Sequence, residues 1–171
     1  LLFSEPERGD VVVFKTPSDN RADYIKRLIG LPGDIIQFID GDLYLNNNQI
    51  FKSIIKKNTS NFCGPHQFTV NTFEEKLPNG RTYKISYSTK FGNDNSEKFI
   101  VPENHYFFLG DNRDCSKDSR FLSEVGYVHQ NNLVGKAQIL FFSSDARVSS
   151  IFNIFKWNKS LRFKRFFKKI I

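Results

Sequence analysis

Short apolar or alternating segments, separated by turn residues, recur along most of the chain. Residues 11–14 form a continuous apolar run between polar turns, which is typical of a buried strand. In residues 24–29 the side chains alternate between two faces, so that Lys26 shares a strand face with Tyr24 and Leu28. The pattern therefore predicts β-strands, one of which carries a lysine among apolar neighbours.

Turn signals join further segments into hairpins. Asp40-Gly41 is a strong hairpin signal and links predicted strands at residues 35–39 and 43–45. Pro78-Asn79-Gly80 marks a second hairpin, with residues 81–87 as its returning strand. Additional strands are predicted at residues 99–101, 106–109 and 137–142, and the last of these is expected to close the body of the protein.

These elements predict a mainly β fold built from antiparallel sheets. Between residues 46 and 96 the composition shifts to Asn, Lys, Ser and Thr, which favours an inserted β-rich lobe. The expected division is a core of residues 1–45 and 97–145, the inserted lobe of residues 46–96, and a basic C-terminal tail of residues 146–171.

The positive charge of the chain is concentrated in this tail. Seven of the 25 Lys and Arg residues lie in residues 151–171, which contain no Asp or Glu, and the other 18 equal the 18 acidic residues. Apolar residues recur in the tail at spacings of three and four, which predicts a basic amphipathic helix. Such a helix is typical of an anionic membrane surface. A solvated tail is the main alternative, and single-stranded nucleic acid is a more distant one.

Composition limits the remaining classes of protein. No stretch of 18 apolar residues is free of charges, so no transmembrane helix is predicted. The chain contains no Met, from which we expect a fragment or a processed product. Cys63 and Cys115 permit one disulfide without implying it, and the three His residues complete no metal site with Cys63. We expect no metal and no cofactor.

The loop of residues 110–120 has the highest density of reactive groups. It contains three carboxylates, two arginines and two hydroxyls directly after an apolar strand. A calcium loop fails on spacing, because Ser119 and Val125 stand where a Gly and a bidentate Glu are required. A solvated polar loop with exposed Asp–Arg pairs remains the simple alternative.

Lys26 is the second candidate for chemistry. A lysine in a strand is usually exposed, but burial among apolar groups lowers the pKa of an ammonium group and creates a general base near neutral pH. Tyr24 and Leu28 would provide such surroundings.

Three segments of the sequence, in the order in which they occur, resemble the type I signal peptidases, and the resemblance is closest to the alphaproteobacterial members. They are Arg8-Gly9-Asp10-Val11-Val12-Val13-Phe14, the segment from Tyr24 to Asp34, and the loop of residues 110–120. The resemblance extends over residues 8–142. It implies a membrane-bound serine endopeptidase that removes signal peptides from exported preproteins by a Ser–Lys dyad, at the bacterial inner membrane with its catalytic domain on the periplasmic side.

The resemblance also assigns roles to residues. Lys26 matches the general base, Ser116 the hydroxyl that orients the lysine, and Asp118 and Arg120 an ion pair that supports the site. The positions that match the substrate groove, which holds an extended peptide with small side chains, are Val13, Asp23, Tyr24 and Ile25.

The sequence departs from the family pattern at important positions. The family's nucleophile lies in a Ser-x-Ser-Met-x-Pro segment upstream, and Ser4 is not a substitute for it. We therefore expect the nucleophile, part of the oxyanion hole and the membrane anchor to be missing from this chain. Cys115 stands where the family usually has Asn and is expected to place a thiol near the lysine, and His129 replaces a common Pro.

Two other interpretations remain open. A self-cleaving LexA-type regulator also uses a Ser–Lys pair on a related β fold, but it carries no comparable loop, and no helix-turn-helix is visible here. A non-catalytic, membrane-associated binding module is compatible with the missing nucleophile.

Overall fold

The computed structural model describes residues 5–89, 95–141, 143 and 161–170 of the chain. Two compact units are formed, Leu1–Lys136 and Ala137–Ile171. The described residues are mostly in β-strands, as the sequence predicts, and helix is confined to short 3₁₀ turns. Each unit is treated by itself below.

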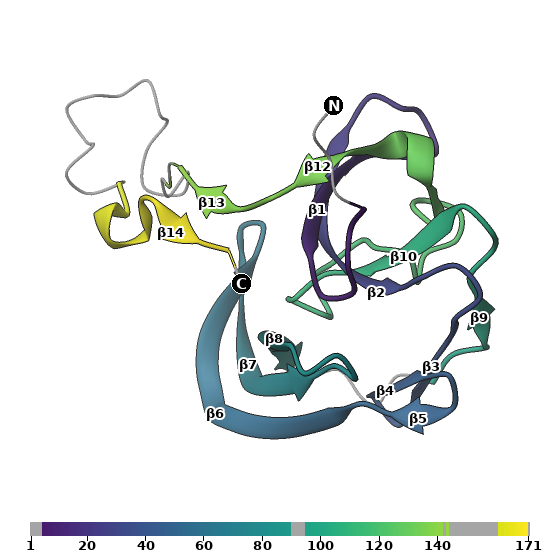
Figure 1. Cartoon of the computed structure of the whole chain (residues 1–171). Helices are drawn as coiled ribbons and strands as arrows, with labels where there is room; N and C mark the ends of the chain where they lie inside the picture. The colour runs from purple at the N-terminus through teal and green to yellow at the C-terminus, as the bar shows by residue number, and fades with distance from the viewer. Residues whose placement is uncertain (1–4, 90–94, 142, 144–160, 171) are drawn as a thin grey trace. The chain divides into compact units, whose positions relative to one another are not determined.

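The first unit contains three sheets of antiparallel strands (Figure 1). The five-stranded sheet has the order β11-β10-β2-β1-β12 and the four-stranded sheet the order β5-β4-β3-β9. The third has the order β6-β7-β8. The bounds of the first two sheets are β1 Val11–Lys15, β2 Asp23–Gly30, β3 Ile35–Ile39, β4 Asp42–Leu45, β5 Asn48–Gln49, β9 Phe99–Ile100, β10 His105–Leu109, β11 Val128–His129 and β12 Leu133–Lys136.

The hairpin signals of the sequence are confirmed. Asp40 and Gly41 both have positive φ angles, of 49° and 77°, and connect β3 to β4, as a two-residue hairpin turn requires. The turn at residues 78–80 joins β7, His66–Lys76, to β8, Thr82–Ser88. The expected inserted region is indeed rich in β structure.

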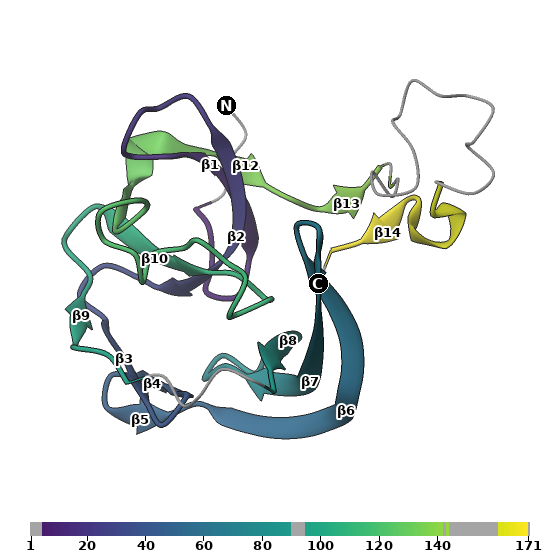
Figure 2. The ribbon, with the colours of Figure 1, turned by 180° about the vertical axis from the view of Figure 1, so that it is seen from behind.

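The longest hairpin lies in the predicted β-rich lobe, but its two strands are not predicted individually from the sequence. It consists of β6, Phe51–Cys63, and β7, and Figure 2 shows from behind that β8 lies along β7. The residues of β6 are mostly polar and largely exposed, so they lack the apolar alternation that marks a half-buried strand.

The strand that closes the body also differs from the prediction. The five-stranded sheet ends with β12, Leu133–Lys136, which pairs with β1, whereas the expected strand at residues 137–142 is wrong in its bounds. Gly135 interrupts the apolar pattern there and obscures the strand. In the second unit, among the described residues 137–141 of the predicted range, the only strand is β13, Ile139–Leu140.

The three sheets of the first unit share one hydrophobic core. Side chains from all three sheets contribute to it, including Ile29 of β2, Phe38 of β3 and Ile85 of β8. A second cluster lies on the other face of the five-stranded sheet and includes Phe14, Leu28 and Phe108. β2 is therefore covered on both faces, and the lysine-bearing half of this strand adjoins the second cluster.

In the second unit, β13 pairs with β14, Lys168–Lys169, and a 3₁₀ turn spans Phe163–Arg165. The predicted amphipathic helix is thus wrong for these residues, because backbone pairing replaces helical hydrogen bonds there. The rest of the expected helix, at residues 152–160, lies outside the described residues. Among the described residues, no helix is long and apolar enough to cross a membrane.

Candidate active site

Lys26 lies in the first half of β2, directly opposite Val12 of β1. Its side chain is partly buried, and its Nζ atom is 5.4 Å from the centre of the Tyr24 ring. Val12 and Leu28 are fully buried beside it. The strand alternation therefore places the lysine among apolar groups, as the sequence predicts.

This environment changes the acidity of Lys26. Burial lowers the pKa of the Lys26 ammonium group below its usual value. The carboxylate of Asp118 opposes this by attraction, Arg120 adds to the lowering by repulsion, and Asp111 raises the pKa. The net effect is a pKa below normal, which increases the share of neutral amine at a given pH.

The loop of residues 110–120 turns back onto β10. Phe108 and Ser119 form two hydrogen bonds: the Ser119 amide donates to the Phe108 carbonyl at 3.0 Å, and the Phe108 amide donates to the Ser119 hydroxyl at 2.9 Å. The Gly110 amide donates to the Asp118 carboxylate at 2.9 Å. The loop is thus fixed to the end of β10 rather than solvated.

Ser116 is brought over Gly110 by this turn and is nearly buried. Leu109 of β10 lies opposite Arg27 of the antiparallel strand β2. Gly110, which follows Leu109, and Lys26, which precedes Arg27, therefore lie beside this pair at the same end. The Ser116 hydroxyl has no hydrogen-bond partner among the described residues. The predicted Lys26–Ser116 hydrogen bond is therefore not formed, although the fold brings their segments together.

The predicted ion pair of Asp118 and Arg120 is present. The Arg120 Nε atom is 2.8 Å from Asp118 Oδ1, and its Nη2 atom is 3.0 Å from Oδ2. Asp118 is fully buried, and the Arg120 guanidinium lies over the ring of Phe38, 5.5 Å from its centre. Since the pair is buried, the interpretation of an exposed polar loop is wrong.

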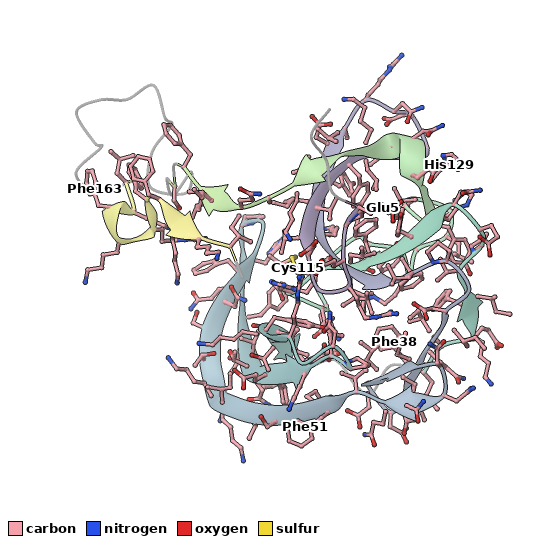
Figure 3. The ribbon with its side chains drawn as sticks, in the orientation of Figure 1. Glu5, Phe38, Phe51, Cys115, His129 and Phe163 are labelled. Carbon is pink, nitrogen blue, oxygen red and sulfur yellow. A yellow bond between two sulfur atoms is a disulfide. The ribbon has the colours of Figure 1, made fainter. Side chains whose placement is uncertain are left out.

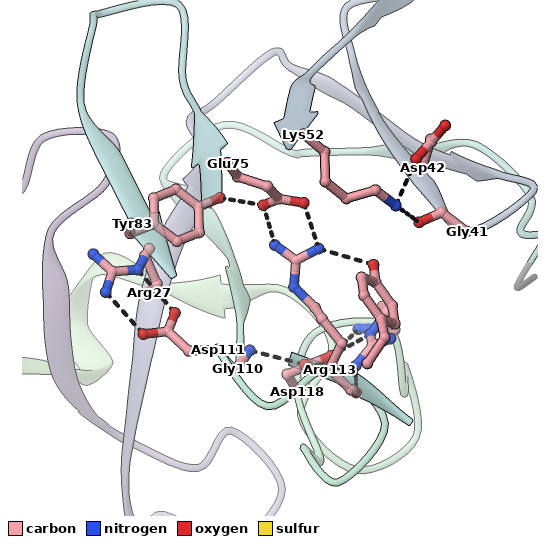
Figure 4. Close-up of polar contacts among 12 residues, drawn as sticks. Arg27, Gly41, Asp42, Lys52, Glu75, Tyr83, Gly110, Asp111, Arg113 and Asp118 are labelled. Carbon is pink, nitrogen blue, oxygen red and sulfur yellow. Dashed lines mark hydrogen bonds and ion pairs between the residues drawn. The ribbon is translucent and has the colours of Figure 1, made fainter. Parts of the chain in front are cut away.

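Two further ion pairs at this loop were not predicted (Figure 4). Arg27 of β2 binds Asp111 at 2.8 Å and lies over the Tyr83 ring. Arg113 is fully buried and pairs through both terminal nitrogens with Glu75 of β7. The presence of Arg113 in the polar loop was visible in the sequence, but nothing local identifies Glu75 as its partner.

The disulfide that the sequence left open is formed between Cys63 at the end of β6 and Cys115 in the loop. The yellow sulfur–sulfur bond is visible beside the label of Cys115 in Figure 3. The expectation of a free thiol near Lys26 is therefore wrong, because the sulfur of Cys115 is part of the disulfide. The disulfide ties the residue before Ser116 to the β6–β7 hairpin.

The expected substrate positions gather on β1 and β2. Val13 and Ile25 are directly opposite each other, and Ile25 is 53% exposed. Asp23 forms an exposed ion pair with Lys15, and Tyr24 packs beside Phe14. Within the described residues β10 pairs with β2 only from Arg27 onward. The backbone of residues 23–26 thus has a strand on one side only, in the described part of the chain.

The whole chain is similar to proteins of a known family. Residues 2–142 match the family described as "Signal peptidase, peptidase S26". The "Signal peptidase I" of Rickettsia typhi is 44% identical over an alignment covering 99% of this chain and 68% of that protein, and that of Rickettsia prowazekii is 42% identical with the same coverages. A crystal structure of a signal peptidase I from Enterococcus faecalis V583 is 27% identical, with a TM-score of 0.46, and covers 79% of this chain and 98% of that chain.

Proposed function

The chain belongs to the signal peptidase I family of serine endopeptidases, and we propose that it cleaves signal peptides by a Ser–Lys dyad with Lys26 as general base. The observation that carries this proposal is the lowered pKa of the partly buried Lys26 amine. Residues 1–45 and 97–145 would form the catalytic core, and residues 46–96 the inserted lobe.

The proposed chemistry begins with the neutral amine of Lys26. It takes the proton from a serine hydroxyl while the serine oxygen bonds to the scissile carbonyl carbon. The proton then passes to the leaving amine, and water hydrolyses the resulting acyl-enzyme ester. The nucleophile expected for this family lies in a Ser-x-Ser-Met-x-Pro segment, which the printed sequence does not contain.

Three loop residues would support the base. The Ser116 hydroxyl, which has no partner within the described structure, is available to accept a hydrogen bond from Lys26 once the site is complete. Asp118 and Arg120 would hold the turn that carries Ser116, because both are bonded within it. These are positioning roles.

The substrate would bind as an extended strand beside residues 23–26. The unpaired side of this segment offers backbone groups for such a strand, and the exposed Ile25 with Val13 offers an apolar surface for its side chains. Small residues at the first and third positions before the cut would fit best.

We propose that the basic tail contacts the lipid of the membrane in which the preprotein substrate would be anchored. Arg162, Lys168 and Lys169 lie in the second unit with the exposed Phe163 and Phe167, so cations and aromatic groups occur together there. In a bacterium, the expected place is the inner membrane, with the catalytic residues on the periplasmic side.

The test joins the Ser-x-Ser-Met-x-Pro segment of a related signal peptidase to the N-terminus of this chain and measures cleavage of a signal-peptide substrate. Activity should appear, should be lost in Lys26→Ala and should not return in Lys26→Arg, because Arg stays protonated and cannot accept the serine proton. Full activity of Lys26→Arg would show that Lys26 is not the base. Specific peptide binding without cleavage would instead support the non-catalytic binding module.

A further inference from the structure

The three-stranded sheet β6-β7-β8 is attached to the catalytic loop by an ion pair that is closed to solvent. The Arg113 and Glu75 side chains are only 0% and 1% exposed, and the Arg113 Nη1 atom lies 3.0 Å from Glu75 Oε1. The Tyr83 hydroxyl donates to Glu75 Oε2 at 2.7 Å (Figure 4). Arg113 Nη1 donates to the Tyr87 hydroxyl at 3.0 Å. Both carboxylate oxygens of Glu75 are thus engaged.

Arg113 is held in its charged form by its partner. Burial by itself would lower the pKa of Arg113, but the Glu75 carboxylate holds this pKa well above its usual value. A buried ion pair of this kind adds little net stability compared with apolar side chains of similar size, because the desolvation of both charges opposes their attraction. A role in stability alone therefore explains the pair poorly.

The contacts of Arg113 lead to the residues around Lys26. The Arg113 carbonyl accepts a hydrogen bond from Arg120, which binds Asp118 through its guanidinium. The Asp118 carboxylate in turn accepts a hydrogen bond from the amide of Gly110, the residue against which Ser116 packs. A continuous series of hydrogen bonds therefore connects β7 to the turn that carries Ser116.

The edge of β8 adds backbone bonds to the same part of the loop. The Ser86 amide donates to the Asp111 carbonyl at 2.8 Å, and the Arg113 amide donates to the Ser86 carbonyl at 3.0 Å. The loop thus extends the sheet by one short parallel bridge at Asn112. The buried ion pair with Glu75 fixes the side chain of Arg113, the residue that directly follows the bridge at Asn112.

We propose that Glu75 is a positioning residue of the active site, which holds the loop of residues 110–120 against Lys26 through its ion pair with Arg113. The proposal rests on the assignment of Lys26 as the base, and it gives the inserted lobe a part in catalysis. If Glu75 no longer holds Arg113, the loop loosens, water reaches Lys26, and the lysine approaches its ordinary acidity.

The experiment titrates Lys26 in this chain without requiring activity. The rate at which an acylating reagent modifies the Lys26 amine is measured against pH by mass spectrometry. Groups that act on this amine are the Tyr24 ring on β2 and, from the loop, Asp111, Asp118 and Arg120, and all remain unchanged in the variants. Glu75→Gln is compared with Glu74→Gln, whose side chain belongs to the neighbouring position on β7.

We expect the midpoint of Lys26 labelling to rise by about half a pH unit or more in Glu75→Gln and to stay unchanged in Glu74→Gln. Because Glu75→Gln leaves a buried cation without its partner, the double variant Glu75→Gln/Arg113→Met serves as a second test, and the same rise is expected in it. An unchanged midpoint in either folded variant would overturn the proposal. Loss of the fold in both variants would also overturn it, since the pair would then be required for folding.

A second readout separates this proposal from the proposed function. In the chain joined to the nucleophile segment, Glu75→Gln should lower kcat/KM about tenfold and move the rise of activity with pH to higher pH. If the joined wild-type chain is inactive while the labelling midpoint still rises in Glu75→Gln, the coupling stands and only the proposed dyad fails.

Discussion

Ser116 lies so close over Gly110 that a Cβ atom added to Gly110 would be 2.0 Å from the Ser116 hydroxyl oxygen and 2.3 Å from its Cβ. No side chain larger than hydrogen fits at Gly110 while Ser116 keeps this position. The close contact explains why a glycine must begin the loop, and it allows the placement of Ser116 to be tested by substitution.

Gly110→Ala should therefore displace Ser116 and lower the free energy of unfolding by about 1–3 kcal/mol, as overpacking of a buried site does. Chemical denaturation measures this loss. The matched variant is Gly110→Ala/Ser116→Gly, which removes both clashing atoms and should recover most of the stability. Equal stability of Gly110→Ala and the wild type would contradict the placement of Ser116.

Lys26→Met should stabilise the chain, by about 0.5–2 kcal/mol at neutral pH, because it removes a charge that is costly to bury. The folded chain has the lower Lys26 pKa, so the unfolded state binds more protons between the two pKa values, and stability rises with pH there. The destabilisation by Lys26 is complete below its folded pKa and is lost as the pH rises toward its unfolded pKa. Thermal unfolding of both proteins against pH should show the difference shrinking at alkaline pH; a constant difference would argue against a lowered pKa.

The Cys63–Cys115 disulfide should contribute about 2–4 kcal/mol to stability, because it restricts an unfolded loop of 52 residues. A reducing agent should lower the unfolding midpoint of the wild type. Cys63→Ser/Cys115→Ser should already have the lower midpoint and should not respond to the reducing agent. The same response in both proteins would mean that the bond does not form in solution.

Ile25→Ser should impair cleavage with little effect on the fold. Because Ile25 is 53% exposed, the free energy of unfolding should change by no more than about 0.5 kcal/mol. In the chain joined to the nucleophile segment, kcat/KM for a signal peptide should fall about tenfold if Ile25 contacts the substrate. Ile100→Ser, at a position on β9 that is 61% exposed, serves as the control and should leave kcat/KM unchanged.

Removal of residues 152–171 should weaken binding to anionic lipid vesicles, and it should reduce cleavage of membrane-anchored preproteins more than that of a soluble peptide. Each cation near an anionic surface contributes about 1 kcal/mol at best, so binding should also weaken with salt. Co-sedimentation with vesicles measures it, and vesicles of zwitterionic lipid are the control. Equal sedimentation with and without the tail would mean that these residues do not bind lipid and are simply solvated.

The sequence determined those features that depend on neighbouring residues. Apolar runs located β1 and β10, alternation located β2, and the glycines at positions 41 and 80 located hairpins, since turn geometry is a local property. The motifs around Lys26 and in the loop of residues 110–120 indicated the family, and strand alternation placed Lys26 among apolar groups. All of these signals lie within a few residues of the feature that they predict.

Which polar groups are buried together depends on the tertiary fold. Glu75 and Arg113 are 38 residues apart, and Cys63 and Cys115 are 52 apart, so neither partner marks the other in the sequence. The long hairpin of β6 and β7 was hidden for the same reason, since its polar residues gain their strand structure from pairing rather than from an apolar face. A buried polar group is stable only when its partner is present, and that partner is supplied by the fold.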